Sequence, residues 1–127
     1  MRTIVIIGAG AGGTMVAANL KKELNGEDWH IIVIDRDPQH HFQSGYLFIP
    51  FGVYSATEIV KPKRDFIPPG VEFVVGEVTR IDAQQRRVET AGGGSFNYDW
   101  LVISTGCRIV PQEVEGMMDA WRQDVFD

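Results

Sequence analysis

Three glycines near the amino terminus have the types and spacing of a phosphate-binding turn. Gly8, Gly10 and Gly13 satisfy G-x-G-x-x-G within GAGAGG, directly after an apolar run and before helix-forming residues. The first glycine permits a tight turn, the second lets the backbone approach a pyrophosphate, and the third lets a helix pack closely on a strand. Free N–H groups around Ala11 and Gly12 would face the phosphate oxygens. The alternative is an ordinary flexible turn between a strand and a helix.

Asp35 is the second part of the same pattern. It lies 22 residues after Gly13, close to the roughly 20-residue spacing of a carboxylate that binds ribose hydroxyls. By itself Asp35 would be an ordinary turn or cap aspartate, but in register with the glycines it predicts a dinucleotide-binding site. Arg36 follows and would either reach an adenosine phosphate, stack on adenine or remain an ordinary surface arginine.

The elements that must position these residues form one strand–helix–strand unit. Residues 2–7 are a nearly continuous apolar run, which is typical of a parallel strand covered on both faces. Apolar side chains at helical spacing predict a helix over 13–25, with Asn25-Gly26 as its C-terminal cap. A second buried strand at 30–35 completes the unit, which we expect to have a right-handed crossover.

The rest of the chain predicts a long excursion followed by more strands. Residues 39–70 are rich in aromatics, prolines and glycines, with one helical turn expected near 57–60. A loop of this length is usually functional, the alternative being a stretch packed by its own aromatics. Strand character then resumes at 71–75, 78–82, 86–90 and, after a turn at 92–94, in a further short strand and a last buried strand at 100–104. We therefore predict an α/β, Rossmann-like single domain whose parallel sheet carries an inserted antiparallel meander.

Composition fits one soluble globular domain and excludes several classes of protein. The 127 residues are 44% hydrophobic and 23% charged, with 12 basic against 17 acidic residues and a net charge of -5. Because no basic stripe suits a phosphate backbone, we expect no nucleic-acid partner. No apolar run approaches the roughly 20 residues that span a bilayer, and the first strand leaves no room for a signal peptide, so we expect a cytoplasmic chain.

The meander favours FAD over NAD as the dinucleotide. An NAD-dependent dehydrogenase would normally continue with a further helix and parallel strand, whereas this chain makes an aromatic excursion and then a meander. The segment YDWLVISTG ends the last strand in a second glycine turn, at Thr105-Gly106, which would face the cofactor at the carboxyl edge of the sheet.

Three segments resemble the N-terminal FAD signatures of the flavoprotein superfamily with two dinucleotide-binding domains, the pyridine nucleotide-disulfide oxidoreductases. They are GAGAGG with Asp35, VVGEVTRID, and YDWLVISTG. Within that superfamily, HHFQSGYLFIPFG followed by EIVKPKRDFIPPGVEFVVGEV most resembles the sulfide:quinone oxidoreductases and their flavocytochrome c sulfide dehydrogenase relatives. The resemblance covers essentially the whole chain, although only the middle segment distinguishes the subgroup.

The resemblance implies a place on FAD for each signature. The turn at 8–13 would hold the pyrophosphate, and Asp35 would bind the adenosine ribose. Val78 would meet the adenine through its backbone, while Thr105 and Gly106 would line the cofactor where the chain passes towards a second domain. Pro50 would lie near the isoalloxazine ring, or would merely shape its loop.

Cysteine usage departs from some relatives. Some coenzyme A disulfide reductases of the superfamily have a cysteine before a glycine where this chain has Ser44-Gly45. Cys107 is the only cysteine, so no internal disulfide can form. It follows STG directly and would be either a catalytic thiol or a buried small side chain. The cysteines that oxidise sulfide in the resembled family lie largely beyond this region.

Length is the largest departure from the resembled family. Its members continue with a second nucleotide-binding unit, return to complete the FAD domain and end in a region that contacts quinone or membrane. We therefore expect residues 1–127 to be a truncated, N-terminal part of a longer protein, inactive alone and holding FAD weakly or not at all. The full-length protein would be peripheral to the inner face of the membrane.

Other polar and apolar clusters receive simpler interpretations. The adjacent His40 and His41 lack a third ligand at metal-site spacing, so we expect no metal. The run KPKR at 61–64 is interpreted as a solvated charged loop, the alternative being a segment that meets an acidic partner. The apolar residues of YLFIPFGVY could face a missing part of the protein, and their exposure predicts self-association.

Three functions follow as hypotheses. The first is the FAD-binding part of a sulfide:quinone oxidoreductase-like enzyme, which would pass electrons from a reduced sulfur donor through FAD to quinone. The second is a type II NADH:quinone oxidoreductase, which shares the same FAD signatures. The third is a non-catalytic nucleotide-binding module that senses or scaffolds.

Overall fold

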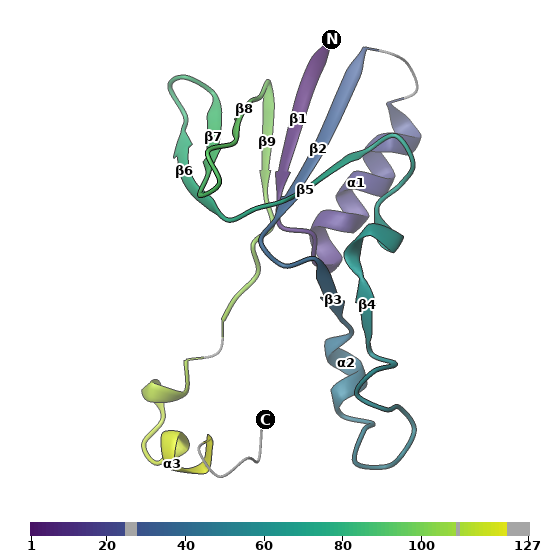
Figure 1. Ribbon diagram of the computed structural model, residues 1–127, viewed down its shortest axis with the longest axis vertical. Helices are drawn as coiled ribbons and strands as arrows, with labels where there is room; N and C mark the ends of the chain where they lie inside the picture. Colours follow the sequence, from purple (N-terminus) through teal and green to yellow (C-terminus); the bar gives the residue numbers. More distant parts are fainter. Residues whose placement is uncertain (25–27, 109, 122–127) are drawn as a thin grey trace.

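A four-stranded parallel sheet forms the centre of the computed structural model, which describes residues 1–24, 28–108 and 110–121. The spatial order of the strands is β5-β2-β1-β9, and every neighbouring pair is parallel (Figure 1). Their bounds are β1 (Arg2–Ile7), β2 (Trp29–Asp35), β5 (Glu72–Val75) and β9 (Trp100–Ile103). The predicted strand–helix–strand unit is therefore confirmed as β1, α1 and β2.

Helix α1 (Ala11–Glu23) covers one face of this sheet. Because successive side chains of a strand point to opposite faces, Ile4 and Ile6 meet the helix while their neighbours do not. They pack in one cluster with Ala17, which is completely buried. The helix is capped by the N–H of Leu24, which donates to the Leu20 carbonyl at 2.8 Å. The predicted cap at Asn25-Gly26 lies outside the described residues.

A three-stranded antiparallel sheet covers the other face. Its strands are β6 (Val78–Asp82), β7 (Arg87–Thr90) and β8 (Ser95–Asn97). Val5 and Ile34 of the parallel sheet pack against the fully buried Val88 of β7. The predicted meander is therefore a separate layer, and the core of this α/β fold lies between helix, parallel sheet and antiparallel sheet (Figure 1).

The excursion after β2 builds a small structure of its own. Strands β3 (Gln39–His41) and β4 (Val60–Pro62) pair antiparallel, with helix α2 (Gln43–Tyr46) between them and the short helix η1 (Lys63–Phe66) after them. The helical turn expected near 57–60 is instead a non-helical turn at 56–59 that leads into β4. Figure 1 shows α2, β3 and β4 projecting beyond the carboxyl ends of β1 and β2.

Aromatic side chains pack this excursion internally. The rings of Phe42 and Phe48 each meet the ring of Tyr54 edge to face, with centroids 6.2 Å apart. Ile59 is buried, and a Cβ atom added to Gly45 would lie 2.7 Å from the side chain of Ile59 and equally close to the ring of Phe42. The segment is thus held by its own contacts while much of its apolar surface faces outward.

Strand β9 differs from the prediction of a buried strand at 100–104. It pairs only with β1 among the described strands, so it forms an edge of the parallel sheet. Its terminal side chains, Trp100 and Ile103, are 63% and 62% exposed. The chain then leaves the sheet through η2 (Pro111–Glu113) and α3 (Met117–Trp121). Within the described residues, no helix is both long and apolar enough to cross a membrane.

Candidate functional site

A cavity of about 300 Å³ opens at the carboxyl ends of the parallel strands. Open α/β sheets bind ligands at this edge, because loops and helix amino termini converge there. The cavity brings together seven of the residues singled out from the sequence. They are Gly8, Asp35, Arg36, Val78, Thr105, Gly106 and Cys107. These residues come from four segments that are far apart in the sequence.

Backbone hydrogen bonds hold the four segments side by side just beyond the strand ends. The N–H of Gly8 donates to the Ile34 carbonyl, and the N–H of Gly76 donates to the Asp35 carbonyl, both at 2.8 Å. On the other side of β1, the N–H of Ser104 donates to the Ile7 carbonyl at 2.8 Å. The parallel ladders are thus prolonged into the loops that line the cavity, which fixes the positions of those loops.

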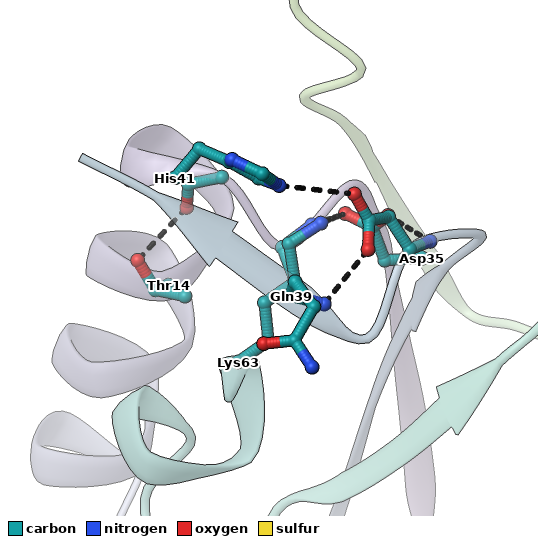
Figure 2. Close-up of polar contacts among 8 residues, drawn as sticks. Thr14, Asp35, Gln39, His41 and Lys63 are labelled. Carbon is teal, nitrogen blue, oxygen red and sulfur yellow. Dashed lines mark hydrogen bonds and ion pairs between the residues drawn. The ribbon is translucent and has the colours of Figure 1, made fainter. Parts of the chain in front are cut away.

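The glycine turn contains two positions that tolerate no side chain and one that faces open space. Gly8 has φ +98°, and a Cβ atom there would collide with the backbone carbonyl of Ser104. A Cβ atom on Gly13 would collide with the Gly8 carbonyl. A Cβ atom on Gly10, the N-cap of α1, would meet no atom within 4 Å. Thr14 closes the first turn by donating its hydroxyl to the Gly10 carbonyl at 2.8 Å (Figure 2).

Most of the glycine turn lies beside the cavity and is not part of its lining. Gly8 lines the cavity, whereas within the described residues Gly10, Ala11, Gly12 and Gly13 do not. The first N–H groups of α1 have no acceptor within the helix. They also lie at the positive end of the helix dipole. The start of α1 therefore has donors and free space for an anion next to the cavity.

Asp35 lies at the end of β2 and gathers three donors (Figure 2). Its Oδ2 atom accepts the N–H of Ala9 at 2.6 Å and the ammonium of Lys63 at 2.8 Å. Its Oδ1 atom accepts the N–H of Asp37 at 2.9 Å, an aspartate turn that fixes the carboxylate relative to its own backbone. The side chain is only 13% exposed, so the arrangement is nearly closed to solvent.

The same contacts set the charge of Asp35. Burial alone would raise the pKa of Asp35, because a carboxylate loses hydration in the interior. The hydrogen bonds from Lys63, Asp37 and Ala9, with the positive charge of Lys63, outweigh burial and hold the pKa below its ordinary value of 3.8. Asp35 is therefore ionised at neutral pH and can act only as a hydrogen-bond acceptor.

Lys63 is a site residue that the sequence interpretation missed. The interpretation of 61–64 as a solvated charged loop is correct only in that Lys61 and Arg64 are exposed, since Lys61 lies in β4 and Arg64 in η1. It is wrong for Lys63, which is buried. Lys63 is 7% exposed, and its backbone N–H donates to the Pro38 carbonyl at 2.8 Å. The local sequence offers no clear signal for this burial, since the partner carboxylate lies 28 residues earlier.

Cys107 and Arg36 both line the cavity with exposed side chains. The interpretation of Cys107 as a buried small residue is therefore wrong. Pro50 does not join this group. It is exposed in the turns that follow α2, within the segment that projects beyond the sheet. Gly76 and Glu77 also line the cavity, and their place directly before Val78 was the available sequence signal.

His41 makes local contacts outside the cavity. Its Nδ1 atom lies 2.9 Å from the hydroxyl of Tyr46, and its Nε2 atom lies 3.8 Å from the Asp37 carboxylate. Its neighbour His40 stacks at a tilt on Phe66, with ring centroids 4.8 Å apart. Among the described residues, no group of three or more histidine, cysteine or acidic side chains could hold a metal ion.

Comparison with known proteins identifies the family. Residues 2–126 match the family model described as pyridine nucleotide-disulphide oxidoreductase. The chain is 32% identical, over 116 residues, to the mitochondrial sulfide:quinone oxidoreductase of Dictyostelium discoideum, covering 91% of this chain and 25% of that protein. It is 28% identical, over 120 residues, to the type II NADH:quinone oxidoreductase of Staphylococcus haemolyticus, covering 93% and 29%.

A solved structure agrees with these sequence matches. The sulfide:quinone oxidoreductase of Aquifex aeolicus superposes with a TM-score of 0.74 and 29% identity, covering 87% of this chain and 25% of that one. The chain thus spans about a quarter of the length of these relatives. The predicted fold class is confirmed, since the parallel sheet with its helix and added antiparallel sheet matches this neighbour.

Proposed function

Because the chain belongs to the pyridine nucleotide-disulphide oxidoreductase family, we propose that it is the FAD-binding portion of an FAD-dependent oxidoreductase. The family is one of oxidoreductases, and together with the structural neighbours it implies a flavin-binding fold. The observation that carries the proposal for FAD is the single cavity that gathers Gly8, Asp35, Val78 and Thr105. These residues belong to the three segments whose patterns resemble FAD signatures.

The cavity fits the adenosine end of the cofactor. Asp35 is an ionised acceptor and would take a ribose hydroxyl. Val78 lies at the start of β6 and would meet the adenine through its backbone. Arg36 is exposed on the wall of the cavity, where it would stack on the adenine or approach a phosphate. The proposed pairs are thus a carboxylate with a hydroxyl, a backbone segment with adenine, and a guanidinium with adenine or a phosphate.

The glycine turn fits the pyrophosphate. Gly8 and Gly13 bring strand, helix and neighbouring backbone too close for any side chain. The position of Gly10 leaves room for phosphate oxygens, and the N–H groups of Ala11 and Gly12 would donate to them. In this proposal Gly8 and Gly13 are glycines because the packing leaves no room for a side chain, and Gly10 is a glycine because the phosphate needs the space.

The chain that leaves β9 lines the same cavity. Thr105 and Gly106 would face the cofactor there, and Gly106 has the positive φ of +69° that allows this turn. Pro50, in the loop after α2, would lie near the isoalloxazine ring. Cys107 lines the cavity together with Asp35 and Val78, so in this proposal it lies at the adenosine end. We therefore assign it no catalytic step.

The whole protein is proposed to act as a sulfide:quinone oxidoreductase. It would oxidise a reduced sulfur donor by two electrons and reduce a quinone to the quinol, and FAD when bound supplies this redox chemistry. Similarity to the Dictyostelium and Aquifex proteins supports this choice. The 127-residue chain alone is proposed to bind FAD weakly and without turnover. The full-length protein is proposed to be cytoplasmic and peripheral to the inner face of the membrane, where quinone resides.

A second candidate is a type II NADH:quinone oxidoreductase. Similarity to the Staphylococcus haemolyticus protein supports it, because the matched region again covers almost all of this chain. The two candidates share the adenosine and pyrophosphate geometry and differ in the electron donor. Steady-state assays of the full-length protein with sulfide and with NADH separate them, and each candidate fails if its own donor supports no quinone reduction.

Cofactor binding is tested first on the chain itself. Isothermal titration calorimetry with FAD and with ADP should detect binding, and Gly10→Leu should abolish it, because the side chain would occupy the phosphate position. Thermal unfolding of Gly10→Leu serves as the control for folding, since a Cβ atom there meets no neighbour. Unchanged affinity in a folded Gly10→Leu variant would refute the placement of the pyrophosphate. A full-length protein that is purified colourless and takes up no FAD refutes both enzyme candidates.

A further inference from the structure

Lys63 is a buried charge to which the proposed function gives no task. Its side chain is 9% exposed, and its ammonium lies 2.8 Å from Asp35 Oδ2. It reaches Asp35 from the start of η1 (Figure 2). The Lys63 N–H also donates to the Pro38 carbonyl at 2.8 Å, which ties this segment to the chain after β2. Both the side chain and the backbone of Lys63 are thus fixed relative to the carboxylate.

The contacts of Asp35 nearly use up its capacity to accept hydrogen bonds. An ionised carboxylate has about four acceptor positions, two on each oxygen. Oδ2 fills both of its positions, with the N–H of Ala9 at 2.6 Å and the ammonium of Lys63 at 2.8 Å. Oδ1 accepts the N–H of Asp37 at 2.9 Å. Among the contacts of the described residues, one position on Oδ1 is left for a ligand.

We propose that Lys63 is a positioning residue that restricts Asp35 to a single ribose hydroxyl, received on Oδ1. The inference rests on the proposed function, in which Asp35 faces the ribose of an adenine nucleotide. If Oδ2 were free as well, the carboxylate could accept the 2′ and 3′ hydroxyls together. With Oδ2 occupied, one hydroxyl binds Asp35 and the other adds little to affinity. Lys63 thereby determines how many ribose hydroxyls contribute to nucleotide affinity, without itself contacting the nucleotide.

A purely structural ion pair would have different consequences. If Lys63 only stabilised the fold, its removal would lower the unfolding free energy and weaken all adenine nucleotides alike. A residue that occupies one carboxylate oxygen instead changes the relative affinities of nucleotides that differ by one hydroxyl. The experiment therefore measures the ratio of the affinities for two nucleotides that differ by one hydroxyl. A uniform loss of stability does not alter this ratio.

The experiment compares ADP, 2′-deoxy-ADP and 3′-deoxy-ADP by calorimetry on the 127-residue chain. For the unmodified chain, one deoxy analogue should bind about tenfold more weakly than ADP, because a hydrogen bond to a charged group is lost. The other analogue should bind within about twofold of ADP. Lys63→Met fills similar space without an N–H donor, so both analogues should then bind about tenfold more weakly than ADP. Lys61→Met, an exposed lysine two residues away, should keep the original pattern.

Several results would overturn the inference. Equal losses with both analogues in the unmodified chain mean that both hydroxyls are read, and no loss with either means that neither is. An unaltered ratio in Lys63→Met means that Lys63 does not set the pattern. Lys63→Gln repeats the comparison if the methionine variant does not fold, and the measurement on the unmodified chain needs no variant. Failure of both ADP and FAD to bind refutes the proposed function itself, and this inference with it.

Discussion

The Asp35 carboxylate is held by the N–H groups of Ala9 and Asp37 and by the ammonium of Lys63. Because the carboxylate is 13% exposed, removing its cation would leave a charge that water compensates poorly. Breaking a pair of this kind typically costs about 3 kcal/mol or more, even where forming the pair adds little net stability. The pair with Lys63 therefore makes the end of β2 sensitive to both pH and mutation.

The stability of the chain should depend on pH through Asp35. The folded-state pKa of Asp35 is lowered below 3.8, so in this range the unfolded chain binds more protons than the folded one. The contribution is fully present above the unfolded pKa, close to 3.8, and it is lost as pH falls through the folded pKa. Urea unfolding at a series of pH values should therefore show a shallower acid limb for Asp35→Asn than for the unmodified chain.

Lys63→Met provides the companion measurement for this prediction. The lysine is among the groups that lower the pKa of Asp35, so its removal should also flatten the acid limb. Curves that run parallel in all three proteins would show that Asp35 does not couple to folding, and would contradict the assigned direction of its pKa shift.

Cys107 provides a probe for occupancy of the cavity. Its side chain is exposed and lines the cavity together with Asp35 and Val78. If adenosine binds there, ADP at ten times its dissociation constant should slow alkylation of Cys107 by iodoacetamide by about tenfold, because only the free protein reacts. Glutathione alkylated in the same solution is the control for the reagent. An unchanged rate in saturating ADP would mean that the nucleotide binds elsewhere.

At the scale of elements, the bounds of some strands could be predicted from local sequence, whereas strand pairing and exposure could not. The predicted bounds of β1 and β6 match the structure, because each is an apolar or alternating run between clear breaks. The pairing of β3 with β4 was not predictable, since both strands are short and lie on either side of the aromatic excursion. The exposure of β9 depends on its place at the edge of the sheet, which its own residues do not encode.

The candidate site likewise has residues that the motifs predicted and contacts that they could not predict. The cavity unites residues that the motifs singled out, because the carboxyl ends of parallel strands meet at one edge. The motifs could not reveal Lys63, whose burial depends on how η1 returns to the end of β2. They also could not reveal Ser104 as the neighbour that excludes a side chain at Gly8. Such contacts are long-range, and they arise only once the layers have packed.

The junction of β1 and α1 should separate folding from binding. In Gly13→Ala the new methyl group would collide with the Gly8 carbonyl, so the unfolding free energy should fall by about 2 kcal/mol or more as the helix moves away from the strand. Gly10→Ala meets no atom within 4 Å and should cost about 1 kcal/mol at most, mainly through the N-cap preference. Urea unfolding measures both variants. Equal losses would contradict the asymmetry between the two glycines.

At the scale of the whole molecule, the chain exposes more surface than its mass requires. Its accessible surface is 9102 Å². A compact monomer of 14.2 kDa is expected to expose roughly 6,800 Å². The difference arises in part because the excursion with α2 and the segment with α3 project from the three-layer core (Figure 1). Exposed large apolar side chains are densest in the excursion, which carries seven of them between residues 42 and 54.

The excursion should make the chain self-associate. Leu47, Phe51 and Val53 are 70%, 76% and 58% exposed within seven residues, although Phe42, Phe48 and Tyr54 pack among themselves. Contiguous exposed apolar surface of this kind favours association, since burying it between copies removes it from water. Sedimentation velocity at increasing concentration should therefore show a rising average mass, and Phe51→Glu should reduce it.

Met15→Glu is the matched control for that prediction. Met15 is 64% exposed on α1, so the substitution removes a similarly exposed apolar side chain and adds the same charge at another surface. If charge alone prevented association, both variants would become monomeric, whereas an interface formed by the excursion should respond only to Phe51→Glu. A monomer at every concentration of the unmodified chain would contradict association altogether. In that case the apolar side chains of the excursion would be tolerated in water without a partner.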